Sequence, residues 1–194
     1  PRVYIVAFSR AYFGQHISIL PKEAPCKRSR TPVFENLKDV LDEKVDPRFF
    51  LSSGYLETLE KHIVTQHDKG YGFGYCIVNA PEIKNPIANT LLATGGSGRE
   101  RNLIYDPING ASCAGTSVKG KYSPINDKYI RTMTPNEWGR LQGFIGYAFV
   151  DENGADQFSF PEGIPNVQKF KQFGNSVTIP VSYTHLTLPT SDLV

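Results

Sequence analysis

The chain has 194 residues, of which 40% are hydrophobic and 12% aromatic, enough for one ordinary domain with a buried core. Its 21 basic and 19 acidic residues leave a net charge of only +2. Overall charge therefore does not mark a nucleic-acid-binding protein, and any basic surface has to be local. No apolar run approaches the roughly 18 residues that a membrane-spanning helix needs, so we expect no membrane partner.

The cysteines and histidines favour neither disulfides nor a metal site. Cys26, Cys76 and Cys113 are odd in number, widely spaced and in no C-x-x-C pair, which argues against a disulfide framework and against zinc. The spacing of His62 and His67 would not place them on one helix face. We therefore expect no metal, and a reducing, cytoplasmic setting.

The chain begins with the pattern of an α/β domain. Residues 3–8 are a continuous β-branched and aromatic run, typical of a strand buried on both faces. The polar stretch over residues 10–31 predicts a loop. Thr31 as a cap and Pro32 in the first turn, followed by apolar residues at helical spacing, predict a helix over residues 32–43.

A second helix is expected over residues 52–69, with Leu56, Leu59 and Ile63 on one face and Gly70 past its end. The character of the sequence then changes. Short β-type runs broken by Gly, Asn and Pro predict a small, twisted, mostly antiparallel unit. These runs are "YGFGYCIVNA", "IANTLLATGG", "NLIYD" and "KYIRTM".

Two short helices are expected near the end of the chain. In "TPNEWGRLQGF", Thr134 caps the helix, Pro135 lies in its first turn, Glu137 completes a capping box and Gly143 ends it. "PNVQKFKQFG" predicts another helix ending at Gly174. The order of elements indicates an α/β fold interrupted by an inserted, irregular β-rich domain.

The stretch "LLATGGSGRERNLIYD" is the first candidate for function. Gly95, Gly96 and Gly98 let the backbone approach a ligand closely. Arg99 and Arg101 could read guanine bidentately or clamp phosphate. Composition alone favours a hairpin loop with solvated arginines. It is not a P-loop, because no Lys-Ser/Thr pair follows at the required spacing.

Two other stretches read as structural when each is taken alone. "TPNEWGRLQGF" is best explained as a helix with Trp138, Leu141 and Phe144 in the core. In "KQFGNSVTIP", the Gly-Asn-Ser turn could hold a polar ligand, but capping of the next element is the simpler explanation.

In their order and spacing, these stretches together resemble the C-terminal half of the cytosine-C5 DNA methyltransferases. "PRVYIVAF" is similar to the end of that family's arginine-bearing motif, and "ANTLLATGG" to the Thr-Leu signature of its target-recognition region. "TPNEWGRLQGF" is similar to the ninth motif and "KQFGNSV" to the tenth, which is the most specific. The resemblance covers about residues 1–181.

The resemblance implies a Rossmann-like α/β domain that binds S-adenosylmethionine, a smaller domain that reads double-stranded DNA, and a cytosine flipped out between them. A cysteine thiolate would attack C6 so that C5 can take the methyl group. A bacterial restriction–modification enzyme of this kind is expected to be monomeric and paired with a restriction endonuclease. The expected divisions are catalytic domain (1–70), target recognition (71–131), return to the catalytic domain (132–181) and a non-native tail (182–194).

The resemblance also assigns roles to individual positions. Arg2 matches an arginine near the flipped base and its phosphate. Asn175 and Ser176 match residues that hold the amino-acid end of the cofactor, and Arg140 and Gln142 are expected to brace the recognition region. The positions expected to contact DNA are Thr90, Leu91, Thr94, Gly95, Gly96, Arg99 and Arg101.

Parts of the family pattern are missing from these 194 residues. The Gly-rich cofactor motif, the Pro-Cys-Gln nucleophile and the Glu-Asn-Val motif should all precede residue 1, so we expect an incomplete, inactive fragment. Cys26 follows Pro25, but it comes after the arginine motif and is followed by Lys27, so it is not expected to be the nucleophile. Two alternatives remain open: a non-catalytic DNA-binding module, and a relative that methylates cytosine C5 in transfer RNA.

Overall fold

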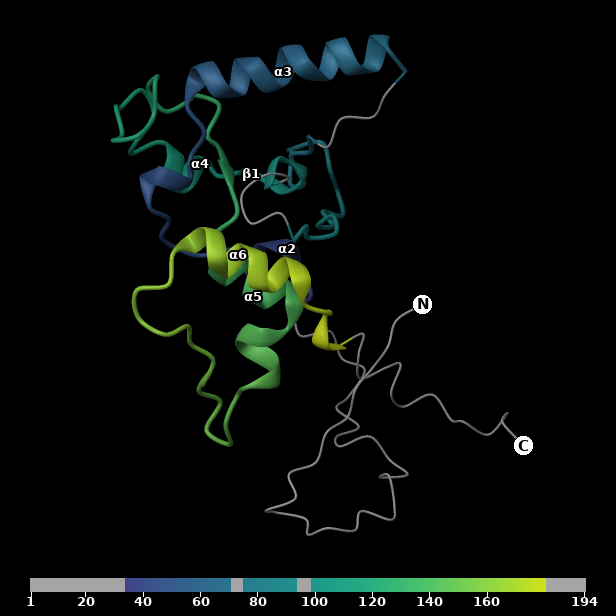
Figure 1. Cartoon of the computed structure of the whole chain (residues 1–194), viewed down its shortest axis with the longest axis vertical. Coiled ribbons are helices and arrows are strands. Elements are labelled where there is room, and N and C mark those ends of the chain that lie inside the picture. The colour runs from purple at the N-terminus through teal and green to yellow at the C-terminus, as the bar shows by residue number, and fades with distance from the viewer. Residues whose placement is uncertain (1–33, 71–74, 94–98, 181–194) are drawn as a thin grey trace, which may run out of the picture.

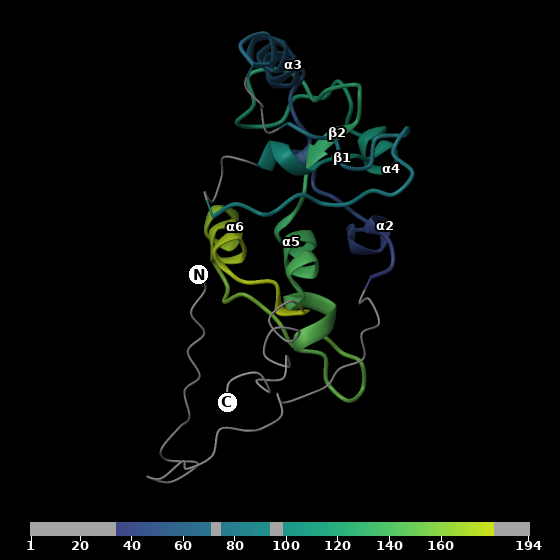
Figure 2. The same ribbon diagram turned by 90° about the vertical axis from the view of Figure 1, so that its right-hand side faces the viewer.

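A computed structural model of the chain describes residues 34–70, 75–93 and 99–180. These residues form a mixed α/β structure, shown from two sides in Figures 1 and 2. Its helices and strands are α2 (Leu37–Val40), α3 (Ser53–Asp68), β1 (Leu103–Tyr105), α4 (Pro107–Gly110), β2 (Ile130–Thr132), α5 (Pro135–Gln142) and α6 (Asn166–Asn175). Helix α3, the sheet and α4 lie in the upper part of Figure 2, and α2, α5 and α6 lie beneath them.

Helix α5 forms as its capping residues predict. The Thr134 side chain accepts a hydrogen bond from the Glu137 amide, and the Glu137 carboxylate accepts one from the Thr134 amide. Pro135 lies in the first turn, and Gly143 ends the helix in the left-handed conformation, with φ of 77°. Trp138 is buried, and Leu141 and Phe144 pack against the same cluster, so the predicted core residues are confirmed.

Helix α3 is also confirmed, with Leu56 and Leu59 buried beneath it. Its C-cap is Lys69, and Gly70 follows at a φ of 75°. Helix α6 ends at Asn175, one residue beyond the predicted glycine.

The first predicted helix is much shorter than expected. Of the described residues 34–43, only Leu37–Val40 is helical, with Asn36 and Asp39 forming the capping box, and Leu41 already has extended backbone angles. Arg140 from α5 donates a hydrogen bond to the Val40 carbonyl at 2.9 Å, so a tertiary contact takes up a carbonyl at the end of this helix.

The predicted β-rich unit contains less regular sheet than expected. β1 and β2 pair antiparallel, with Leu103 opposite Thr132, as "NLIYD" and "KYIRTM" predict. Ile77 adds only an isolated parallel bridge to Leu103, and the described residues 87–93 form no strand. Within this segment, the main-chain amide and carbonyl of Asn89 are instead hydrogen-bonded to the side chain of Asn102.

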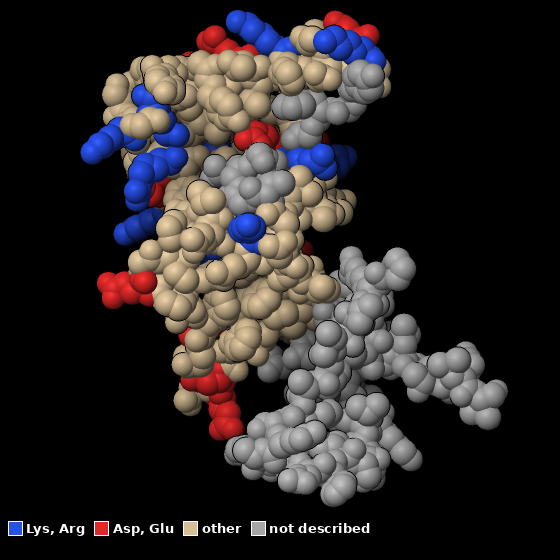
Figure 3. Space-filling model, viewed as in Figure 1, with Lys and Arg blue, Asp and Glu red and all other residues tan. Residues whose placement is uncertain are grey.

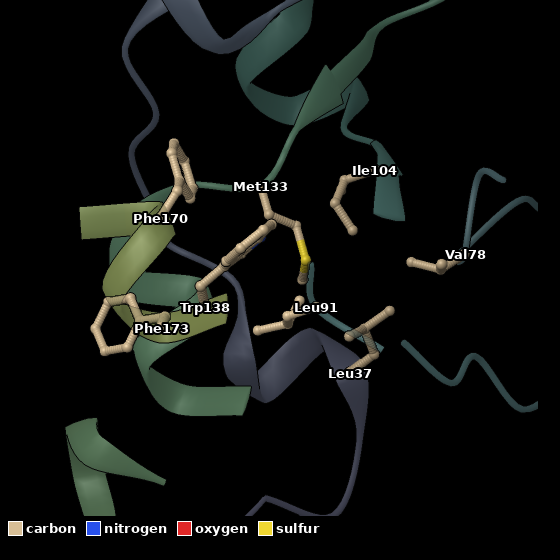
Figure 4. Packing of buried hydrophobic residues seen from close by; sticks show 8 residues of the cluster. All are labelled: Leu37, Val78, Leu91, Ile104, Met133, Trp138, Phe170 and Phe173. Atoms are coloured by element: carbon tan, nitrogen blue, oxygen red, sulfur yellow. The ribbon is translucent and has the colours of Figure 1, made fainter. Parts of the chain in front are cut away.

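The main core lies between the sheet and helices α5 and α6. Trp138 meets Phe170 edge to face, with ring centroids 4.8 Å apart, and the same cluster contains Ile104 of β1 and Met133, which directly follows β2 (Figure 4). The buried members are Leu37, Val78, Leu91, Ile104, Met133, Trp138, Phe170 and Phe173. Leu91 therefore ties the Thr-Leu segment to the two C-terminal helices.

Several predictions fall outside the described residues: the strand at residues 3–8, the loop over 10–31, the cap at Thr31 and the tail at 182–194. Within the part of the chain that is described, no helix is both long and apolar enough to cross a membrane.

Candidate functional site

A buried ionic network connects the sheet to α5. Arg131 on β2 has no exposed surface, and its guanidinium forms two parallel hydrogen bonds with Glu137, at 2.9 and 2.8 Å. Its Nε also donates to Asp106 at 2.8 Å. The bidentate geometry and the additional bonds satisfy both charges, which is the condition under which a buried ion pair is tolerated.

The same network extends to the loop after α2. Asp42 accepts hydrogen bonds from the Thr134 hydroxyl and from Arg140, each at 2.6 Å. The Asp42 amide donates to Glu137 at 2.9 Å. Arg140 thus braces α2 and the loop that follows it against α5, whereas the resemblance implied that it braces the recognition region.

Asp106, the N-cap of α4, has a pKa set by opposing effects. Burial alone would raise the pKa of its carboxyl, but hydrogen bonds from the Asn109 amide, Arg131 and the Asn109 side chain, together with the charge of Arg131, outweigh it. The pKa of Asp106 therefore lies below its usual value, and its ionised form stabilises the fold.

This shift predicts how stability depends on pH. Because the folded-state pKa is depressed, the contribution of Asp106 is present above its unfolded pKa of about 3.9 and is lost as pH falls through the folded value. Asp106→Asn should lower the free energy of unfolding at pH 7. The difference in this free energy between the variant and wild type should become smaller below about pH 4. Urea unfolding at several pH values measures it, with the exposed Asp68→Asn as control. A difference in the free energy of unfolding between Asp106→Asn and wild type that stays constant down to pH 2 contradicts this account.

The Thr-Leu segment presents Thr90 and buries Leu91. Thr90 is exposed, whereas Leu91 is 8% exposed and belongs to the main core. The preceding residue, Asn89, is bonded to Asn102 through its main chain and to the Arg101 carbonyl through its side chain. Thr90 is therefore an accessible hydroxyl on a fixed backbone.

The two predicted arginines belong to a single 3-10 turn, Arg99–Asn102. Arg101 is exposed, while the neighbouring Asn102 is 1% exposed. The carbonyl of Glu100 accepts a hydrogen bond from Cys76 at 2.9 Å, and its carboxylate accepts one from Tyr55 at 2.7 Å. The described structure thus holds Arg101 near Thr90. Arg2, Thr94, Gly95 and Gly96 lie outside the described residues.

The two predicted cofactor residues lie at the C-terminal end of α6. Asn175 is exposed, so its amide is accessible to a ligand. The Ser176 hydroxyl donates to the Phe173 carbonyl at 2.6 Å, which leaves its oxygen able only to accept. Gln142 donates to the same Phe173 carbonyl and accepts from Thr178 at 2.6 Å, so it braces this end of α6, whereas the resemblance implied that it braces the recognition region.

Gly174 brings the end of α6 against the Thr-Leu segment. A Cβ at Gly174 would overlap the Leu92 carbonyl oxygen and lie 2.7 Å from the Ala93 nitrogen. Only glycine permits this approach of two backbones. Two motifs that are far apart in the sequence, Thr-Leu and Gly-Asn-Ser, therefore meet in space (Figure 2).

No role was predicted from the sequence for Asn89, Asn102, Asp42 or Arg131. Asparagine and aspartate usually indicate turns or caps, and no spacing rule links Asn89 to Asn102. The only available signal for Arg131 was its place in an apolar strand pattern, where a charge needs a buried partner.

Cys113 does not offer a nucleophile. Cys113 is buried, and burial raises the pKa of its thiol, which disfavours the reactive thiolate. The Cys113 sulfur also contacts the Asn109 and Gly110 carbonyls within its own turn. Cys26 lies outside the described residues.

Charge is unevenly distributed along the described surface. The segment between α5 and α6 carries exposed Asp151, Glu152, Asp156 and Glu162, and no Lys or Arg occurs between Arg140 and Lys169. In Figure 3, the lower part of the described surface shows red but no blue, and the Lys and Arg side chains lie higher. The segment between α5 and α6 therefore disfavours contact with a polyanion.

Comparisons with known proteins agree on one family. The family model for C-5 cytosine-specific DNA methylase matches residues 1–186. The chain is 36% identical over 180 residues to the Type II methyltransferase M.HpaII of Haemophilus parainfluenzae, covering 92% of this chain and 42% of that protein. It is 30% identical to the DNA-cytosine methyltransferase of Escherichia coli (strain K12), covering 75% and 28%, and 29% identical to M.SsoII of Shigella sonnei, covering 93% and 37%. The chain thus spans less than half the length of these relatives.

Proposed function

Because the chain belongs to the C-5 cytosine-specific DNA methylase family, we propose that it supplies the DNA-reading part of a DNA (cytosine-5-)-methyltransferase of a restriction–modification system. One observation carries this proposal. The Thr-Leu segment with its exposed Thr90 is joined to the turn carrying Arg101 by hydrogen bonds between amide side chains and main chain, and to the Gly-Asn-Ser end of α6 by a close approach of backbones. A surface for DNA would thereby adjoin a site for the methyl donor.

The division of the chain follows from the same proposal. Residues 1–70 would end a Rossmann-like catalytic domain, residues 71–131 would form an inserted target-recognition domain, and residues 132–181 would return to the catalytic domain. The buried network of Arg131, Glu137 and Asp42 would join these three parts to one another. We place the protein in the cytoplasm, acting as a monomer on double-stranded DNA and paired with a restriction endonuclease.

The cofactor proposed is S-adenosylmethionine, which supplies the methyl group when bound. Asn175 suits its amino-acid end, because an accessible amide can both donate to a carboxylate and accept from an ammonium group. Ser176 can contribute only an acceptor, since its proton is used within the helix end. The 194 residues contain no Pro-Cys-Gln sequence, so on their own they should transfer no methyl group to DNA.

The test of this proposal is selective DNA binding. The 194-residue chain is incubated with a pool of random-sequence duplexes, and the bound duplexes are recovered and sequenced over several rounds. We expect enrichment of one short sequence motif. Recovery of duplexes without a shared motif contradicts the assignment of residues 71–131 to target recognition.

Arg101 is expected to contribute directly to this binding. Arg101→Ala should weaken binding to the recovered duplex by about tenfold, the size expected for loss of one good bidentate contact. If Arg101 reads a base, the preference at one position relaxes. If it contacts phosphate, affinity falls for all sequences and the salt dependence becomes shallower.

Fluorescence anisotropy of labelled duplexes at several salt concentrations measures both effects. Arg48→Ala is the matched control, because Arg48 is an exposed arginine paired with Asp46 in a different turn. An Arg101→Ala chain that binds like the Arg48→Ala chain contradicts a role for Arg101 in DNA contact.

A further inference from the structure

We propose that Asn89 and Asn102 form an amide latch that positions Thr90 and Arg101 for sequence reading. This inference rests on the proposed function, and it assigns a role to two residues for which the resemblance implied none. They are positioning residues, since the contacts to DNA would be made by their neighbours.

The latch consists of three hydrogen bonds between two short segments. The Asn89 amide donates to Asn102 Oδ1 at 2.7 Å, and Asn102 Nδ2 donates to the Asn89 carbonyl at 3.1 Å. Asn89 Nδ2 donates to the Arg101 carbonyl at 2.8 Å. Both main-chain groups of the residue before Thr90, and the main chain of Arg101 itself, are therefore fixed by amide side chains.

Because Asn102 is buried, breaking these bonds would cost free energy. Asn102 is 1% exposed, so its side-chain groups cannot exchange these partners for bulk water. Leaving a buried donor or acceptor without a partner costs about 1 to 3 kcal/mol, so the latch should stay closed in the folded chain. Asn102 is also followed directly by β1, whose Leu103 amide donates to the Cys76 carbonyl at 2.8 Å.

Thr90 is held from its other side as well. Leu91 lies in the main core, and the Leu92 carbonyl lies against Gly174 of α6. The exposed Thr90 therefore lies between Asn89 and Leu91, which are both held in place. The exposed Arg101 precedes Asn102, which is held in place as well. Because both segments are held to one another, a shift of either would carry the other with it.

A purely structural role is the competing explanation, and the chain contains a matched case. Asn126 is also 1% exposed and bonds only main-chain groups: Nδ2 donates to the Leu51 and Ile130 carbonyls, and Oδ1 accepts from the Ile130 amide. Its bonds connect Leu51, which precedes α3, to Ile130 of β2. None of them involves the segments that contain Thr90 and Arg101. If Asn102 only satisfies main-chain groups, its loss should resemble the loss of Asn126.

The experiment compares isosteric replacements at the two sites in the full 194-residue chain. The probes are the duplex recovered by the wild-type chain and the same duplex with one base pair changed. Asn102→Asp keeps an acceptor for the Asn89 amide but removes the donor to its carbonyl. It should reduce the ratio of the two affinities about tenfold, comparable to losing one base contact. Asn126→Asp should lower the melting temperature similarly but leave that ratio within about twofold.

Asn89→Ala keeps the experiment decisive if Asn102→Asp does not fold. Asn89 is exposed, and this change removes only the bond to the Arg101 carbonyl. It should reduce the affinity ratio with little change in melting temperature. Folded Asn102→Asp or Asn89→Ala chains with an unchanged ratio overturn the inference. A wild-type chain that recovers no preferred duplex overturns the proposed function instead.

Discussion

Glu137→Ala is expected to lower the free energy of unfolding by about 3 to 5 kcal/mol, the typical cost of removing one partner from a buried ion pair. The change leaves Arg131, which has no exposed surface, without its bidentate partner. It also removes the capping-box bond to the Thr134 amide and the acceptor for the Asp42 amide. Urea denaturation followed by circular dichroism measures the loss.

The matched control is an ion pair at the surface. Glu60→Ala breaks the bond between Glu60 and Lys128, whose side chains are 39% and 58% exposed. That loss should stay within about 1 kcal/mol. The losses from Glu137→Ala and Arg131→Ala should also fail to add in the double variant, because the residues share one network. A Glu137→Ala chain as stable as Glu60→Ala contradicts the role given to the network.

Gly174→Ala should destabilise the chain and separate the two motifs that meet there. The added Cβ would lie 2.5 Å from the Leu92 carbonyl carbon and 2.7 Å from the Ala93 nitrogen. Backbone atoms cannot rotate away as a side chain can, so α6 or residues 89–93 must shift. We expect a loss of about 1 to 3 kcal/mol from overpacking, even though alanine favours a helix by up to about 1 kcal/mol.

Gly54→Ala is the control for Gly174→Ala. Gly54 is also helical, but the nearest atom to its added Cβ is the Ser123 hydroxyl, a side-chain atom, at 3.1 Å. That variant should be nearly neutral in urea denaturation. If Gly174→Ala proves equally neutral and binds the recovered duplex as wild type does, the close contact between the motifs does not matter for the fold or for binding.

The sequence predicted best those parts of the fold that local rules determine. The Thr134 cap, the Glu137 capping box and the left-handed Gly143 all depend on residues within one helix. The Gly70 position after α3 is of the same kind. These signals act over a few residues, so they can be recognised without knowing the tertiary structure.

The predictions that failed depended on distant contacts. Residues 87–93 have the composition of a strand, yet part of their backbone is bonded by Asn102 and they pack against Gly174. The first helix ends at Val40, where Arg140 takes up a carbonyl. The composition of a segment gives its propensity to form a strand or a helix. Contacts with residues far away in the sequence decide whether that strand or helix forms and where it ends.

The candidate site was predictable only in part for the same reason. The motifs indicated Thr90, Arg101, Asn175 and Ser176, but not that their segments adjoin. Asn102 carries no local signal that distinguishes it from a turn residue. Its role follows only from its burial and its bonds to Asn89.

The most direct test of the central claim is a hybrid methyltransferase. The 180 residues of M.HpaII that match this chain are replaced by their counterparts from it, and the hybrid is expressed in bacteria lacking other cytosine-C5 methylation. Bisulfite sequencing of the host DNA then reports every methylated cytosine. We predict methylation within one short motif, the one recovered in the binding selection, and relaxation of that motif by Arg101→Ala. A folded hybrid that leaves DNA unmethylated, or methylates cytosines without sequence preference, would contradict the claim that this chain reads DNA for a methyltransferase.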